Sequence, residues 1–158
     1  MRSRFSWLAV FVTFLIAAVL EVIPLPALVQ AYRPQWLALF LIYWLLRYPE
    51  NIGMTCAVIF GLIMDVISGT TLGVHVLAYA ITCYLILSMH QRLKMFPVIQ
   101  QSAVIFILVA TQLMMVSLLS KMLVGTTNDL SYLWLALSSA VLWPVILILS
   151  DRLSLALR

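Results

Sequence analysis

A carboxylate and an imidazole flank a short glycine-containing turn near the middle of the chain. Asp65 lies toward the end of one apolar run, Ser68-Gly-Thr-Thr71 supplies the turn, and His75 lies at the start of the next run. Because both residues are equally far from the middle of the turn, two antiparallel helices would bring them within reach of a charge-assisted hydrogen bond. Such a couple could respond to protons or bind a ligand, but buried polar pairs more often specify packing. The pattern therefore favours packing.

A second acid and base are separated in a similar way. Glu21 lies at the end of the first apolar run, and Arg33 directly precedes Pro34 at the start of the second. The spacing predicts an ion pair between Glu21 and Arg33 near the membrane surface. A ligand site is the less favoured alternative.

The sequence contains none of the motifs that would indicate an enzyme. It has no His-Glu-x-x-His zinc motif, no Gly-x-Ser-x-Gly nucleophile elbow and no phosphate-binding loop. An intramembrane aspartyl mechanism would need a second carboxylate facing Asp65, and nothing in the sequence pairs Glu21 with it. We expect no catalysis, no cofactor and no metal.

The composition indicates an integral membrane protein. Of the 158 residues, 65% are hydrophobic and 9% are charged, and the mean hydropathy is +1.16. Such a chain cannot cover a soluble core with polar surface. No linker or polar region interrupts it, so residues 1–158 are expected to form one transmembrane domain. Nucleic-acid binding is not expected, because no basic face with interleaved aromatic residues lies outside the membrane.

Six apolar runs predict an all-α membrane protein with about six transmembrane helices. The second and third runs are short, about 22 Å each at 1.5 Å per residue, compared with roughly 30 Å of hydrocarbon. An alternative joins residues 34–67 into one re-entrant unit, but Arg47 and Glu50 at the intervening turn favour two short spans. The predicted helices are 5–23, 34–48, 52–67, 72–90, 98–123 and 131–150.

The basic residues predict the orientation. Lysine and arginine are counted over alternate loops because they are enriched on the cytoplasmic side of membrane proteins. Seven lie on one side, against Arg33 and Lys121 on the other, which places both termini in the cytoplasm. The seven are Arg2, Arg4, Arg47, Arg92, Lys94, Arg152 and Arg158.

Small residues recur at every fourth position in two of the predicted helices, and an acid follows each row. Small side chains on one face allow another helix to approach closely. Each row can therefore be an internal packing face or a docking face for a partner helix, and internal packing is favoured. The rows are Ala9, Thr13 and Ala17, followed by Glu21, and Gly53, Ala57 and Gly61, followed by Asp65.

Four blocks of sequence resemble the MreD family of bacterial rod shape-determining membrane proteins, in its gammaproteobacterial form. The blocks are Tyr32-Arg-Pro-Gln-Trp36, Tyr43-Trp-Leu-Leu-Arg47, Asp65-Val-Ile-Ser-Gly-Thr-Thr-Leu-Gly73 and Val141-Leu-Trp-Pro144. The residues that carry the family pattern are Arg33, Pro34, Asp65, Ser68, Gly69, Gly73, Trp143 and Pro144. His75 and Glu21 are not among them, so both polar pairs are inferred from spacing alone.

The resemblance implies a function without catalysis. Members of the family belong to the wall-elongation machinery in the bacterial inner membrane, where they partner MreC and, through it, MreB filaments, RodA and a class B penicillin-binding protein. It also implies a fold similar to the substrate-binding components of energy-coupling-factor transporters. On this view the protein is a scaffold surrounded by membrane lipid. The two small-residue rows are then candidate faces for the MreC helix, and the basic 91–95 loop and the C-terminal tail are candidate cytoplasmic contacts.

Transport is the competing interpretation. A six-helix protein with Asp65, His75 and Gln112 could bind a small molecule and pass it to an energising module. The polar residues are few and the loops are too short to form an obvious lid. The scaffold is favoured, chiefly by the resemblance.

Overall fold

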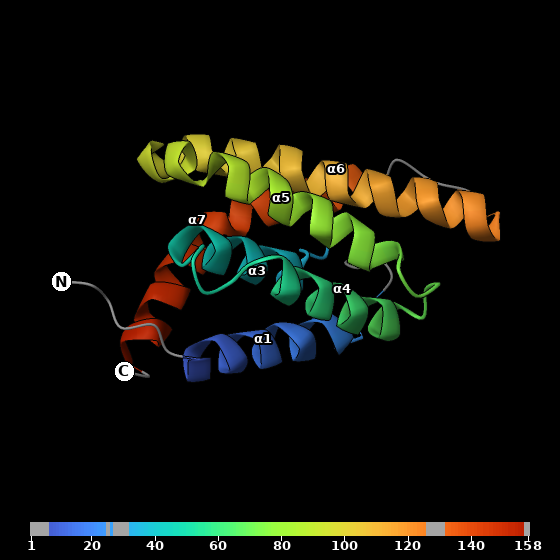
Figure 1. Cartoon of the computed structure of the whole chain (residues 1–158), viewed down its shortest axis with the longest axis horizontal. Coiled ribbons are helices and arrows are strands. Elements are labelled where there is room, and N and C mark those ends of the chain that lie inside the picture. The colour runs from blue at the N-terminus through green and yellow to red at the C-terminus, as the bar shows by residue number, and fades with distance from the viewer. Residues whose placement is uncertain (1–6, 25, 27–31, 126–131, 157–158) are drawn as a thin grey trace.

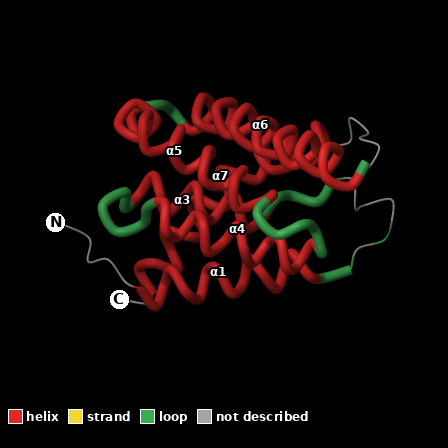
Figure 2. Tube along the Cα trace, turned by 45° about the vertical axis from the view of Figure 1, so that its right-hand side comes forward, coloured by secondary structure: helices red, strands yellow, loops and turns green. Residues whose placement is uncertain are grey.

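The computed structural model describes residues 7–24, 26, 32–125 and 132–156, and in these ranges it consists of helices and loops without strands (Figure 2). The described residues form six helices, as the apolar runs predicted. They are α1 (Trp7–Val22), α3 (Trp36–Arg47), α4 (Met54–Ser68), α5 (Val74–Met95), α6 (Val98–Val124) and α7 (Tyr132–Ala156).

The helix boundaries agree with the apolar runs to within two residues, except at the ends of two helices. The sequence predicted ends at 90 and 150, whereas α5 continues to Met95 and α7 to Ala156. The extra turns carry charged residues such as Arg92 and Asp151. A charged side chain ends the apolar run, but it does not end the helix, because backbone hydrogen bonding continues where the side chain reaches water. Residues 5, 6 and 131 of the predicted helices, and Arg2, Arg4 and Arg158 of the charge count, lie outside the described residues.

The short helix α3 forms the centre of the bundle. Every residue from Leu37 to Leu46 is buried, as expected of a helix that is apolar on all sides. Helices α1, α5 and α7 pack against it, while α4 packs along α5, and α6 packs against α5 and α7. In Figure 1, α1 and α6 form the two outer edges and α3 and α4 lie between them.

The chain runs back and forth, so that the helix ends gather at two ends of the bundle. The beginning of α1 and the end of α7 lie at one end, and the turn between α4 and α5 lies at the other (Figure 1). Helices α5, α6 and α7 are long and apolar enough to cross a membrane, whereas α1, α3 and α4 are shorter apolar helices of 16, 12 and 15 residues. Membrane crossing by these three shorter helices remains a prediction.

Candidate functional site

Two glycines shape the turn that brings Asp65 to His75. Gly69 follows α4 with φ 61°, and Gly73 precedes α5 with φ 105°. Both φ values are positive, and most side chains would be strained there. The N–H of Thr70 donates to the Asp65 carbonyl oxygen at 3.2 Å. The chain therefore reverses direction between two helices within a few residues.

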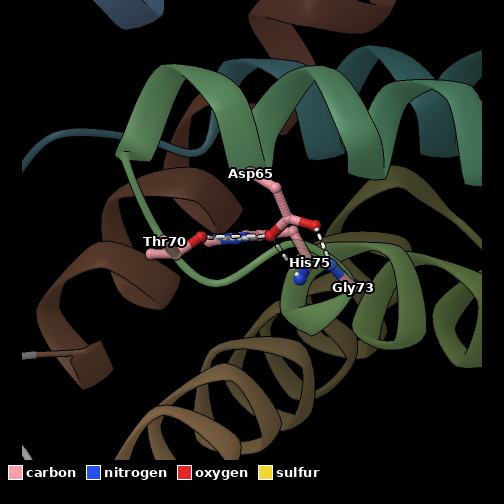
Figure 3. A network of polar contacts seen from close by, with 4 residues as sticks. All are labelled: Asp65, Thr70, Gly73 and His75. Atoms are coloured by element: carbon pink, nitrogen blue, oxygen red, sulfur yellow. Dashed lines mark hydrogen bonds and ion pairs between the residues drawn. The ribbon is translucent and has the colours of Figure 1, made fainter. Parts of the chain in front are cut away.

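Asp65 receives four hydrogen-bond donors (Figure 3). Its side chain is completely buried. Its Oδ2 accepts from the N–H of Gly73 at 2.7 Å. Its Oδ1 accepts from the N–H of His75 at 2.8 Å and the hydroxyl of Thr70 at 3.0 Å, and lies 2.9 Å from His75 Nδ1. Because a carboxylate can only accept, we assign the proton of this contact to Nδ1. The structure thus brings the predicted pair together and adds Thr70 and Gly73 to it.

The two backbone donors explain why a carboxylate lies here. Gly73 and His75 belong to the start of α5, where helix N–H groups have no partner inside the helix. An acceptor at this position satisfies them, and its negative charge complements the helix dipole. Asp65 therefore caps α5 from the neighbouring helix α4. Its oxygens are engaged by the chain itself, so this arrangement fastens two helices rather than presenting an open ligand site.

Gly61, one turn before Asp65 in α4, allows α4 and α5 to approach each other closely. A Cβ atom at Gly61 would lie 2.5 Å from Cα and 2.8 Å from N of Val76, and 3.0 Å from the carbonyl oxygen of His75. These are backbone atoms, which cannot turn aside as a side chain could. The absence of a side chain at Gly61 is therefore required for this packing.

The predicted ion pair between Glu21 and Arg33 is not formed. No salt bridge joins them among those in the described residues. Nη2 of Arg33 instead donates to the carbonyl oxygen of Leu20 at 2.8 Å, in the last turn of α1, where carbonyls lack helical partners. Glu21 is buried, and its Oε2 accepts no hydrogen bond from the described residues. The charge of Arg33 and the backbone N–H groups of Trp36 and Leu37, at the start of α3, act electrostatically on its carboxyl group. Each charge thus acts on a helix end, and the prediction missed these backbone groups.

Most positions of the two small-residue rows are covered by other helices of the same chain. Ala9, Thr13 and Ala17 are fully buried, and the Thr13 hydroxyl accepts the indole N–H of Trp44 from α3 at 2.9 Å. In the second row Ala57 is buried, Gly61 meets α5, and a Cβ at Gly53 would have nothing within 4 Å. The suggestion that these rows are docking faces for a partner is therefore wrong for the buried positions. They serve internal packing.

The other residues of the family pattern lie at helix ends or within α7. The carbonyl oxygen of Pro34 accepts from the N–H of Trp36 at 3.0 Å at the entry to α3. Trp143 is fully buried in α7 and donates its indole N–H to Gln101 of α6 at 3.2 Å. Pro144 follows it inside α7, and Ser68 is the exposed last residue of α4.

A buried polar group that the sequence did not single out lies near His75. Tyr79, one turn further along α5, is fully buried, and its hydroxyl lies beside the side chain of Gln112 on α6. The sequence could have indicated Tyr79, because residues four positions apart lie on the same face of a helix as each other, and Tyr79 is four residues after His75. Within the described ranges, no three His, Cys, Asp or Glu side chains are grouped so that they could hold a metal ion.

The fold and this site define a helical membrane protein in which Asp65 and Arg33 hydrogen-bond to the backbone ends of neighbouring helices. A family model described as rod shape-determining protein MreD matches residues 1–153. The rod shape-determining protein MreD of Haemophilus influenzae is 30% identical to this chain over 159 residues, which cover 97% of this chain and 96% of that protein. The chain belongs to the MreD family of rod shape-determining proteins. No solved structure matches it, so the expected likeness to energy-coupling-factor components stays a prediction.

Proposed function

We propose that this protein is a non-enzymatic scaffold of the wall-elongation complex in the bacterial inner membrane. It binds the membrane helix of MreC and, in the same complex, helps couple MreB filaments to RodA and a class B penicillin-binding protein. Family membership supports a role in rod-shape determination. The fully engaged Asp65 also supports it, because the polar residue that would best serve a transporter already has four donors from its own chain.

The distribution of basic residues supports six crossings with cytoplasmic termini. Helices α3, α5 and α7 end at the same end of the bundle (Figure 1). Basic residues lie in the last turn of α3 (Arg47), in the last turn of α5 (Arg92 and Lys94) and close to the end of α7 (Arg152). The opposite end holds Arg33 and Lys121. An excess of basic residues marks the cytoplasmic side.

The observation that carries the partner assignment is an apolar groove on the outside of the bundle. It has a volume of about 410 Å³, with Phe11, Phe14 and Leu15 of α1 on one wall and Ile59, Phe60 and Ile63 of α4 on the other. Leu37 of the central helix also lines it. The two walls are bridged by stacking of Phe14 on Phe60, with ring centroids 3.4 Å apart.

The shape of this groove suits a single apolar helix. Its lining residues recur at three- and four-residue steps along both helices, so the groove runs along them. Helices α1 and α4 are not among the closely packed pairs of the bundle, and their groove-lining side chains Phe11, Leu15 and Ile59 are exposed. We assign the MreC helix to this groove, because MreC is the membrane partner that the resemblance to the family implies.

The test is co-purification of MreC with the full-length protein extracted in mild detergent. Ile59→Trp would fill the groove and should abolish recovery of MreC. Ile107→Trp, at a comparably exposed position on α6, is the matched control and should retain it. Both variants must be recovered from the membrane in equal amounts. Equal MreC recovery with both would remove the groove from consideration, and recovery of an ATPase pair instead would favour the transporter alternative.

A further inference from the structure

A second cavity lies at the end of the bundle that carries most of the basic residues. It has a volume of about 390 Å³ and is lined by the last turns of α3 and α5, the start of α6 and the C-terminal half of α7. Its polar lining side chains are Tyr43, Arg47, Lys94, Gln101 and Asp151, and Leu46 and Leu147 contribute apolar surface. None of them lines the groove between α1 and α4.

The charges of this cavity do not cancel. The Tyr43 hydroxyl donates to Oδ1 of Asp151 at 2.6 Å, and Nη2 of Arg47 lies 3.5 Å from the same oxygen. Asp151 therefore balances Arg47. No salt bridge in the described chain joins Lys94 to a carboxylate. Two cations and one carboxylate leave the lining with one net positive charge.

The part of the chain that carries Lys94 is held in place. The side-chain amide of Gln101 donates to the carbonyl oxygens of Leu93 and Phe96 at 3.0 and 3.1 Å, and its Oε1 accepts from Trp143. These bonds connect the end of α5 to α6 and α7. The position of Lys94 at the cavity is therefore built into the packing of three helices.

We propose that this cavity binds the phosphate of an anionic phospholipid. The Lys94 ammonium is the principal cation, and the N–H groups of Arg47 that do not face Asp151 supply further donors. Basic pockets between membrane helices on the cytoplasmic side are suited to anionic headgroups. The two leucines offer apolar surface beside the charges, which suits an amphiphile better than a free phosphate ion. The proposal is independent of MreC binding.

The experiment measures binding of phosphatidylglycerol to the purified full-length protein in detergent by native mass spectrometry, with phosphatidylcholine as the zwitterionic comparison. Lys94→Gln should weaken phosphatidylglycerol binding about fivefold, the effect of one basic residue near an anionic headgroup. Lys94→Arg should restore it. Arg92→Gln is the matched control, because Arg92 is an exposed cation in the same last turn that does not line the cavity.

Three results would overturn the proposal. One is equal weakening by Lys94→Gln and Arg92→Gln, which would indicate diffuse surface attraction. The second is equal binding of phosphatidylglycerol and phosphatidylcholine. The third is complete displacement of phosphatidylglycerol by millimolar inorganic phosphate, which would assign the cavity to a soluble anion. Unfolding midpoints without added lipid should be unchanged, because both positions are exposed.

Discussion

Nδ1 of His75 lies 2.9 Å from Oδ1 of Asp65, across the turn that joins α4 to α5. The same oxygen also accepts the backbone N–H of His75. One residue of α5 therefore holds one residue of α4 by both its side chain and its backbone. Sliding either helix along the other by one residue would break both contacts, so this pair sets the register of the two helices.

Replacing Asp65 with alanine should strongly destabilise the protein. The change leaves the N–H groups of Gly73 and His75 without their carboxylate acceptor, and each buried unsatisfied donor costs about 1–3 kcal/mol. The measurement is the free energy of unfolding in detergent. Glu50→Ala, at an exposed position, is the control and should have little effect. His75→Ala should fall between them, because Asp65 keeps the two backbone donors and Thr70. An Asp65→Ala protein as stable as the Glu50 variant would contradict this account.

Adding one methyl group at Gly61 should separate α4 from α5. The new Cβ would lie 2.5 Å from Cα of Val76, so the backbones must move apart, and overpacking of this kind typically costs about 1–3 kcal/mol. Gly53→Ala adds the same group at the N-cap position directly before α4, where nothing lies within 4 Å. Thermal unfolding should show the clearly lower midpoint for Gly61→Ala, because Gly53→Ala exchanges only the N-cap residue. Similar midpoints for the two variants would mean that the helices are not in backbone contact.

The two turn glycines should respond differently to asparagine. Gly69 has φ 61° and ψ 25°, close to the left-handed conformation that asparagine tolerates. Gly73 has φ 105° and ψ −17°, well outside it. Gly69→Asn should therefore be nearly neutral, whereas Gly73→Asn should cost about 1–3 kcal/mol of stability. Unfolding midpoints of the two variants in detergent test the ranking, and the reverse order would disprove it.

Thr13→Val should weaken the packing of α1 on the central helix. The valine has a similar shape but removes the acceptor of the Trp44 indole N–H, which lies 2.9 Å from the Thr13 hydroxyl. We expect a loss of about 1–3 kcal/mol for the buried bond. Thr13→Ser keeps the hydroxyl and should retain most of the stability that valine removes. Equal unfolding free energies for the valine and serine variants would show that the hydroxyl contributes nothing.

The positions of the helices could be predicted from the sequence because apolar runs of membrane helices are long and are broken by charge, proline and glycine. The approach of Asp65 to His75 could also be predicted, since it needs only a turn of known midpoint. The contacts of Arg33 and Glu21 could not. Arg33 donates to the backbone carbonyl oxygen of Leu20, and backbone N–H groups at the start of α3 act electrostatically on Glu21. No residue type in the sequence signals a backbone group.

The centre of the bundle was equally hidden from the sequence. In a soluble protein, apolar faces mark the core, but lipid-facing and core-facing positions of a membrane protein are both apolar. The leucines of α3 are fully buried, whereas Leu15 and Leu62 in neighbouring helices are exposed. Composition alone does not separate these groups. For the same reason the small-residue rows could be assigned to partner or to internal packing only when their neighbours were known.

The enclosure of α3 has a consequence for how the chain is made. Synthesis proceeds from the N-terminus, and α3 leaves the ribosome long before α5 and α7, two of the helices that surround it. Until α7 has been made, part of the α3 surface has no partner from its own chain. The nascent protein must therefore hold a short apolar segment at the translocon, or against lipid, while most of its chain is still being translated. Final closure of the bundle depends on its last helix.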